Sequence, residues 1–117
     1  MKMDRVNPRP GPDGLSAGED QDIATWMASR ADEIARFFKA MSHEGRLMIL
    51  CHLAAGEKSV TELEGLLGQR QAAVSQQLAR LRLEGLVSTR REGKAIFYAL
   101  QDKRVTGLLR ALPEQFD

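Results

Sequence analysis

Residues 71–76 combine side chains that can recognise the edges of DNA bases. Gln71 and Gln76 can each form two hydrogen bonds with an adenine, and Ser75 can contact either a base or a phosphate. Ala72 is small enough to allow close approach of this stretch to a duplex. The chemistry that these residue types predict is base reading in a DNA groove.

Basic residues surround this neutral stretch. Residues 70–104 contain eight Lys and Arg residues and three Asp and Glu residues, whereas the whole chain has a formal net charge of only +1. We expect this local positive charge to neutralise DNA phosphates. The alternative interpretation is that the polar and basic side chains only form a solvated helix face. The cations concerned are Arg70, Arg80, Arg82, Arg90, Arg91 and Lys94.

Cys51 is the only cysteine, which excludes a disulfide within one chain and a site that needs several thiolates. Its spacing from Leu47, Leu50 and Ala54 places it on an apolar stripe, so the residues alone predict a small buried thiol. Its late position in a predicted helix also disfavours a thiolate, because the helix dipole is negative there. On the residues alone we interpret Cys51 as inert.

No arrangement of residues predicts an enzyme or a metal site. His43 and His52 are nine residues apart, and no Asp, Glu or Cys joins either of them at a spacing suited to a shared metal. The sequence has no glycine-rich phosphate loop and no Ser, His and Asp set that the predicted helices would bring together. We therefore predict no catalytic residues, no metal and no required cofactor.

The elements that must position these residues form one predicted domain. Three of the four prolines lie in residues 1–20, which we interpret as a flexible tail, and residues 21–117 suffice for one core. Apolar spacings of three and four predict helices at 22–41, 43–55, 60–67, 71–84 and 103–112. Two β-prone segments around a turn at 91–94 predict a hairpin before the last helix. The expected N-caps are Asp22, Ser42, Ser59 and Asp102, and Pro113 is expected to end or kink the last helix.

The helices at 60–67 and 71–84 are joined by a short turn that contains Gly68, which is typical of a helix-turn-helix. Val74, Leu78 and Leu81 lie at i, i+4 and i+7, so the opposite face of their helix presents the base-reading residues. The hairpin that follows completes a winged-helix shape, which fits duplex DNA. Because no apolar run is long enough to span a bilayer or to act as a secretion signal, we expect a cytoplasmic protein.

Over residues 41–112 the chain resembles the ArsR/SmtB family of winged-helix repressors. The motifs that carry the resemblance are RLMIL, QAAVSQQLARLR and GLVSTRREGKAIFYAL. The resemblance implies a homodimer that binds a palindromic operator and leaves it when an inducer arrives. It also implies that Arg90, Arg91 and Lys94 contact DNA from the wing, and Arg70 departs from the Ser that many members have as helix cap. The first and last helices would hold the dimer through Trp26, Ile34, Phe37, Leu108, Leu109 and Leu112.

The segment ILCHL resembles the sulfide- and redox-sensing branch of the family, the BigR, SqrR and HlyU type. In that branch the cysteine that matches Cys51 reacts with persulfides or oxidants and then joins a second cysteine, whose position here falls near Asp117. Because that position is not a cysteine, either the sequence is a variant or truncation of a two-cysteine sensor, or Cys51 works alone. The resemblance disfavours metal sensing, because only Asp102 matches a metal-ligand position. Three alternatives stay open: a haem sensor that uses Cys51 or a histidine, a protein-binding winged helix with an inert cysteine, and a thiol enzyme.

Overall fold

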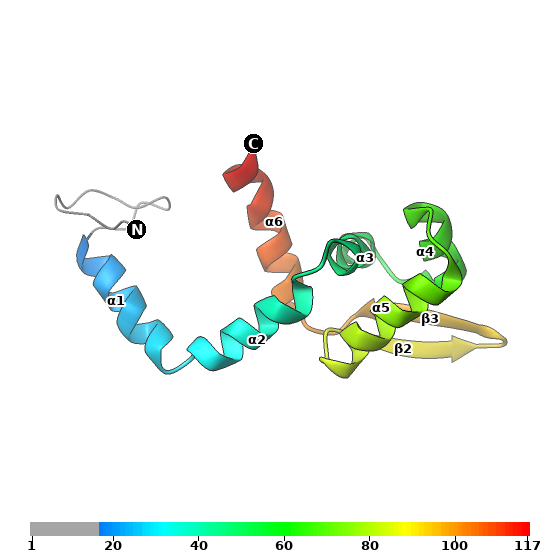
Figure 1. Cartoon of the computed structure of the whole chain (residues 1–117), viewed down its shortest axis with the longest axis horizontal. Helices are drawn as coiled ribbons and strands as arrows, with labels where there is room; N and C mark the ends of the chain where they lie inside the picture. The colour runs from blue at the N-terminus through cyan, green and yellow to red at the C-terminus, as the bar shows by residue number, and fades with distance from the viewer. Residues whose placement is uncertain (1–16) are drawn as a thin grey trace. The chain divides into compact units, whose positions relative to one another are not determined.

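The structure is a computed structural model that describes residues 17–117, with side chains described from residue 22 onward. The described residues form two compact units, which divide between Arg36 and Phe37. The predicted tail at 1–20 lies outside the described residues as far as residue 16. The six helices are α1 (Ala17–Ala28), α2 (Ala31–Met41), α3 (Glu44–Ala54), α4 (Val60–Leu67), α5 (Gln71–Leu83) and α6 (Arg104–Phe116), as Figure 1 shows.

The prediction of one helix over residues 22–41 is wrong, because α1 and α2 are separate and α1 already begins at Ala17. Between Met27 and Ile34 every side chain is small, polar or charged, so no apolar packing favours one continuous helix there. The Arg30 N–H donates to the Met27 carbonyl at 2.8 Å, and the Arg30 carbonyl accepts from Ile34 at 2.9 Å and starts the next helix. The described residues therefore contain six helices instead of five.

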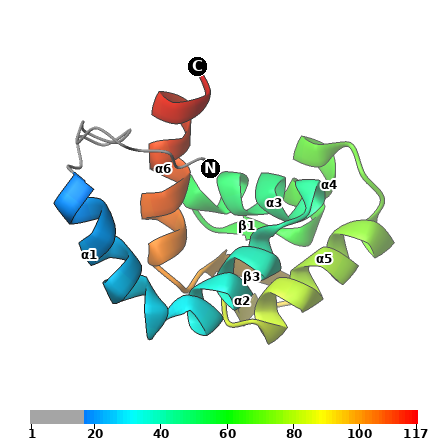
Figure 2. The same ribbon diagram turned by 60° about the vertical axis from the view of Figure 1, so that its left-hand side comes forward.

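The larger unit is built around α3, α4 and α5, whose inward faces form one apolar core. Val74, Leu78 and Leu81 are completely buried, which confirms the predicted inward face of α5. Leu86, which precedes β2, Val87 of the sheet and Val105 of α6 complete this core. Figure 2 shows α6 leaving the end of β3 beside α3, with which it is in contact. This packing leaves the far side of α5 open to solvent.

Of the four expected caps, Ser59 is confirmed, whereas the predictions of Asp22, Ser42 and Asp102 are wrong. Asp22 lies inside α1, which already begins at Ala17, and the caps of α3 and α6 lie one residue later than expected. Ser59 accepts from the Glu62 N–H at 3.1 Å and its own N–H donates to Glu62 at 2.7 Å, which confirms the capping box. The cap of α3 is His43 instead of Ser42, and its Nδ1 accepts from the Gly45 N–H at 3.0 Å. The N-cap of α6 is Lys103 instead of Asp102 and makes no side-chain cap hydrogen bond, although Asp102 accepts from the Arg104 N–H at 3.0 Å. That helix continues through Pro113 to Phe116, so the proline does not end it.

The sheet has three antiparallel strands in the order β1-β3-β2, where the sequence predicted only a hairpin. The hairpin strands β2 (Val87–Glu92) and β3 (Ala95–Leu100) form the wing, with Gly93 at φ +63° in the turn. The third strand, β1 (Lys58–Ser59), pairs Ser59 with Phe97 of β3. A strand of two residues has no alternation from which it could be recognised in the sequence.

None of the helices within residues 17–117 is long and apolar enough to cross a bilayer. The longest described helices, α5 and α6, have 13 residues each, which is well short of the roughly 20 that a bilayer span requires.

Candidate nucleic-acid interface

The outward face of α5 carries three of the four predicted base readers in exposed positions. Gln71, Ala72 and Gln76 are exposed, whereas Ser75 is half-buried. At 3.6 residues per turn, Ala72 and Gln76 lie almost directly above one another on the side opposite the core. The same face ends at Leu83, whose side chain is 82% exposed and which the sequence did not single out. The outward surface of α5 is therefore neutral, with Ala72 and Gln76 at its centre.

Gln71 differs from the other predicted readers because it faces the wing. Its side chain lines a hollow of about 260 Å³ between the starts of α4 and α5 and the strand β3. Thr61 of α4 and Lys94 of the wing line the same hollow. A phosphate that passes between the helix pair and the wing would meet amide, hydroxyl and ammonium donors there. Thr61 is a residue that sequence reasoning missed, since a threonine early in a short helix carries no distinctive signal.

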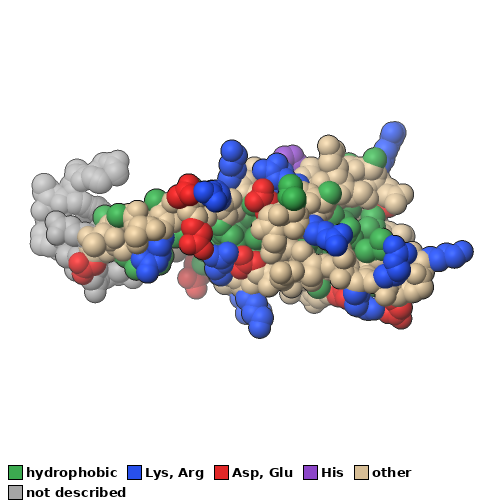
Figure 3. Space-filling view, turned by 90° about the horizontal axis from the view of Figure 1, so that it is seen from below, with side chains coloured by type: hydrophobic (Ala, Val, Ile, Leu, Met, Phe, Trp, Pro, Cys, Tyr) green, Lys and Arg blue, Asp and Glu red, His purple; other side chains and the backbone are tan. Residues whose placement is uncertain are grey.

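The six predicted phosphate-binding cations divide into paired and unpaired groups. Arg80 pairs with Glu84 of the same helix at 3.2 Å, and Arg90 pairs with Glu57 and Glu92. Among residues 22–117, the other four form no ion pair, and all four are exposed. These four are Arg70, Arg82, Arg91 and Lys94. Figure 3 shows Lys and Arg side chains projecting from the right-hand part of the surface, where Figure 1 places the wing and the α4–α5 pair.

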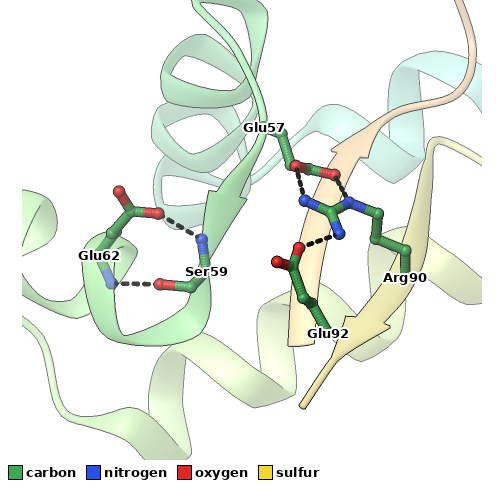
Figure 4. A network of polar contacts seen from close by, with 5 residues as sticks. All are labelled: Glu57, Ser59, Glu62, Arg90 and Glu92. Carbon is green, nitrogen blue, oxygen red and sulfur yellow. Dashed lines mark hydrogen bonds and ion pairs between the residues drawn. The ribbon is translucent and has the colours of Figure 1, made fainter. Parts of the chain in front are cut away.

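The prediction that Arg90 is a free phosphate ligand does not agree with its contacts. Its Nε and Nη2 donate to the two Glu57 carboxylate oxygens at 2.7 and 2.8 Å, and its Nη1 donates to Glu92 at 2.6 Å (Figure 4). The guanidinium also lies over the Phe97 ring, 4.7 Å from the centroid. These hydrogen bonds lower the pKa of Glu57 and raise the pKa of Arg90, which keeps both groups ionised.

The N-terminus of α5 has no side-chain cap. Arg70 occupies the cap position with extended backbone, φ −74° and ψ 154°, and makes no side-chain hydrogen bond to the helix. Serine or aspartate at this position would satisfy one of the free N–H groups. The expected departure at Arg70 therefore leaves helix N–H groups, together with an unpaired guanidinium, available at the start of the predicted recognition helix.

Cys51 is exposed, so the prediction of a buried thiol is wrong. The inward side of α3 carries Ile49, Leu50 and Leu53, all of which are buried. Successive residues are 100° apart on a helix, so this buried side lies roughly 100° around the helix axis from the stripe that Cys51 shares with Leu47. Both sides of α3 are rich in large apolar residues, and the core packs against the side that carries Ile49, Leu50 and Leu53. The thiol therefore lies where a solute can reach it.

Asp102, the one residue that matches a metal-ligand position of the family, is engaged in an internal ion pair. Asp102 pairs with Arg104 at 2.6 Å, and the hydrogen bond from Arg104 is the main cause of the lowered pKa of the Asp102 carboxyl. Across residues 22–117, no three His, Cys, Asp or Glu side chains gather in a way that could hold a metal ion.

The predicted dimer residues are only partly covered by their own units. In the smaller unit, Trp26 is 49% exposed and Ile34 is half-buried. In the larger unit, Phe37 and Leu109 pack on the core from its edge, and Leu108 is half-buried. The predicted dimer contacts leave out two further exposed aromatic residues of the larger unit, one of which belongs to the apolar pattern of the helix predicted at 22–41, while the other lies beyond the end of the predicted last helix. The aromatic residues are Phe38 and Phe116, which line an apolar hollow of about 550 Å³ with Met41, Leu47, Leu108 and Leu112.

Comparisons with known proteins agree with this geometry. Residues 43–89 match the family described as bacterial regulatory protein, arsR family. The chain is 50% identical over 86 residues to the biofilm growth-associated repressor of Agrobacterium fabrum, a match that covers 74% of each chain. It is 47% identical over 86 residues to the transcriptional activator HlyU of Vibrio cholerae, covering 74% of this chain and 80% of HlyU.

Solved structures show the same fold. The crystal structure of the transcriptional repressor BigR from Xylella fastidiosa matches 80% of this chain and 96% of its own, with a TM-score of 0.77 and 45% identity. A domain from Mycobacterium bovis, described as a homodimeric winged helix-turn-helix DNA-binding domain, matches 75% of this chain and 84% of its own, with a TM-score of 0.65 and 32% identity. The curated relatives are named as transcriptional regulators, which agrees with the lack of predicted catalytic residues. The chain therefore belongs to the ArsR family of winged-helix transcriptional regulators, in the branch that contains BigR and HlyU.

Proposed function

We propose that the protein is a homodimeric repressor that binds a palindromic operator and is released by reactive sulfur species or oxidants at Cys51. The observation that carries the DNA-binding part is the exposed neutral face of α5 beside unpaired cations of the helix pair and the wing. In this proposal Ala72, Ser75 and Gln76 read bases, while Gln71 contacts bases or backbone from the wing side. Phosphates are held by Arg70, Arg82, Arg91 and Lys94, with Arg80 at the margin beside Glu84.

The dimer is supported by apolar surface in both units and by the homodimeric relative from Mycobacterium bovis. A small monomer gains little from leaving Trp26, Phe38 and Leu112 in water, whereas a second copy would cover them. A two-fold axis would place the two copies of α5 about one turn of DNA apart, roughly 34 Å. The interface would use Trp26, Ile34, Phe37, Leu108, Leu109 and Leu112, together with Phe38 and Phe116.

The test of DNA binding is selection of duplexes from a random-sequence pool by the purified protein, followed by titration at several salt concentrations. We expect an enriched palindrome and a binding constant that falls steeply with salt, because several phosphates are neutralised. Arg91→Ala should reduce the slope of log K against log salt by about 0.9. No enriched duplex, or an affinity that does not change with salt, would contradict the proposal and favour a protein-binding surface.

The sensing part of the proposal is supported by the exposure of Cys51 and by the position of α3, which contacts both α5 and α6. The Cys51 thiolate would attack the terminal sulfur of a polysulfide, forming a persulfide while the shortened polysulfide leaves with the electron pair of the broken bond. With a peroxide the same thiolate would take one oxygen, giving a sulfenic acid and hydroxide. Because Cys51 is exposed, the added group would act through new contacts on the surface of α3, and a shift of that helix would reach α5 and α6, with which it is in contact.

We expect Cys51→Ser to bind the selected duplex as tightly as the unmodified protein and to lose release by polysulfide or peroxide. Mass spectrometry of Cys51 in the treated sample shows whether an adduct formed and whether the reaction stops after one equivalent. Continued turnover in the presence of a reductant would indicate a thiol enzyme instead. Release that persists in Cys51→Ser would exclude this sensor, and an absorbance titration with haem would then test the haem alternative.

A further inference from the structure

The wing has a feature that DNA binding alone does not explain: its first arginine is held by two carboxylates. Every nitrogen of the Arg90 guanidinium donates a hydrogen bond, two of them to Glu57 and one to Glu92, over distances of 2.6 to 2.8 Å. One face of the guanidinium is also covered by Phe97. These bonds use three of the five guanidinium N–H groups, so a phosphate could reach only the second N–H of Nη1 and of Nη2, and both of these nitrogens already bind carboxylates.

The geometry of this cluster joins both edges of the sheet. Arg90 stands on β2 opposite Phe97 of the central strand β3, and Phe97 is paired on its other side with Ser59 of β1. The Arg90 side chain therefore crosses over Phe97 to reach Glu57, which immediately precedes β1 (Figure 4). The bidentate contact closes the sheet from one edge strand to the other.

The same short segment also fixes the helix-turn-helix. Ser59 caps α4 through its reciprocal bonds with Glu62, and β1 is only two residues long. Glu57 is therefore the point at which the wing is attached to the first helix of the DNA-binding pair. Two ladder positions alone would hold the hairpin weakly, because short strands gain little from pairing.

The charge of the cluster supports a role other than phosphate binding. Glu57, Arg90 and Glu92 together carry one positive and two negative charges, so the part of the wing next to its turn is not a cationic site at these residues. The unpaired wing cations are Arg91, next to Arg90, and Lys94, in the turn. The direction in which these two side chains point depends on how the turn end of the hairpin is held.

We propose that Glu57 positions the wing for DNA by holding Arg90, and that Arg90 is a positioning residue and not a phosphate ligand. The proposal rests on the proposed DNA-binding function. It gives a role to Glu57, a carboxylate that would not contact DNA directly because phosphates carry the same sign of charge. It predicts an effect whose sign is opposite to that of simple electrostatics. Removing a negative charge from a DNA-binding protein ordinarily strengthens binding, whereas removing Glu57 should weaken it.

The experiment titrates Glu57→Ala, Glu57→Gln, Arg90→Ala and the double variant Glu57→Ala/Arg90→Ala with the duplex that the unmodified protein selects. We expect Glu57→Ala to lose about fivefold in affinity, which is the scale of one well-formed exposed ion pair. The double variant should bind no more weakly than Arg90→Ala, because both changes remove the same contact. Glu44→Ala, which removes an exposed carboxylate from the start of α3, is the matched control and should bind equally or more tightly.

Tighter or unchanged binding by Glu57→Ala and Glu57→Gln, with Arg90→Ala weaker, would overturn the proposal and return Arg90 to the phosphate ligands. Glu57→Gln keeps the size of the side chain and one acceptor oxygen, so it decides the sign if the alanine variant does not fold. Amide exchange of β3 in the DNA-free protein gives an independent reading, and faster exchange in Glu57→Gln is expected. If the unmodified protein selects no duplex, the proposed function fails, while unchanged exchange in Glu57→Gln would overturn the positioning role by itself.

Discussion

The helices α3 and α5 have similar lengths and lie against one another, yet only α5 could be oriented from the sequence. In α5 the large apolar residues Val74, Leu78 and Leu81 share one side, and the opposite side is polar or small. In α3 large apolar residues occur all round the helix, so several orientations bury similar area. The comparison teaches that an outward functional face can be predicted where hydrophobicity is segregated, and that packing partners decide where it is not.

Substitutions on the two sides of α3 give the largest expected difference. Leu50 is fully buried, so Leu50→Ala should lower the free energy of unfolding by about 3 kcal/mol through lost burial and a residual cavity. Cys51 is the next residue but is exposed, so Cys51→Ala should change it by less than about 0.5 kcal/mol. Urea unfolding of both variants checks the orientation of α3. Equal losses at the two positions would show that Cys51 is packed in solution.

A matched pair on α5 tests its outward face through DNA affinity instead of stability. Gln76 is exposed at the centre of the neutral face, whereas Gln77 is half-buried and lines a hollow with His43 of α3. Gln76→Ala should cost about 1–3 kcal/mol in binding to the selected duplex and relax its preference at one base pair. Gln77→Ala should leave that preference unchanged. Loss of the same base preference in Gln77→Ala would mean that the reading face is turned toward α3.

A substitution at the start of α5 should have two smaller effects, one on the stability of the fold and one on DNA binding. The cap of α3 is a histidine that accepts an N–H, whereas α5 begins with Arg70 and has no side-chain cap. Arg70→Ser should therefore stabilise the fold by about 0.5–1 kcal/mol while reducing the salt slope of DNA binding by about 0.9. Thermal unfolding and salt titration measure the two effects separately. A variant that is stabilised but keeps the full salt slope would remove Arg70 from the phosphate contacts.

The limits of sequence reasoning in this protein follow the same contrast. The capping box at Ser59, the inward face of α5 and the hairpin were all predictable, because each depends on residues close together in the chain. The break between α1 and α2 was missed, since apolar spacing on both sides of residues 29–30 continued one apparent pattern.

The contact between Glu57 and Arg90 could not be found from the sequence for a different reason. It joins residues 33 positions apart and depends on β1, a strand too short to carry a signal. Charge counts therefore treated Arg90 as equivalent to Arg91, although only Arg90 crosses the sheet to an acidic partner. A free cation and a paired one have the same letter in the sequence, and the fold alone distinguishes them.

The smallest expected effect concerns the ion pair between Glu57, which follows α3, and Arg90, which lies on the strand that follows α5. Arg90 lowers the pKa of Glu57 in the folded protein below the ordinary 4.5, so the contact stabilises the fold fully above that pH. As the pH falls through the lowered pKa, the folded carboxylate is also protonated and this contribution is lost. Urea unfolding should thus show the unmodified protein more stable than Glu57→Gln at about pH 7, with a difference that shrinks toward about pH 3. A difference that is absent at neutral pH, or that grows on acidification, would mean that the ion pair between Glu57 and Arg90 does not stabilise the fold in solution.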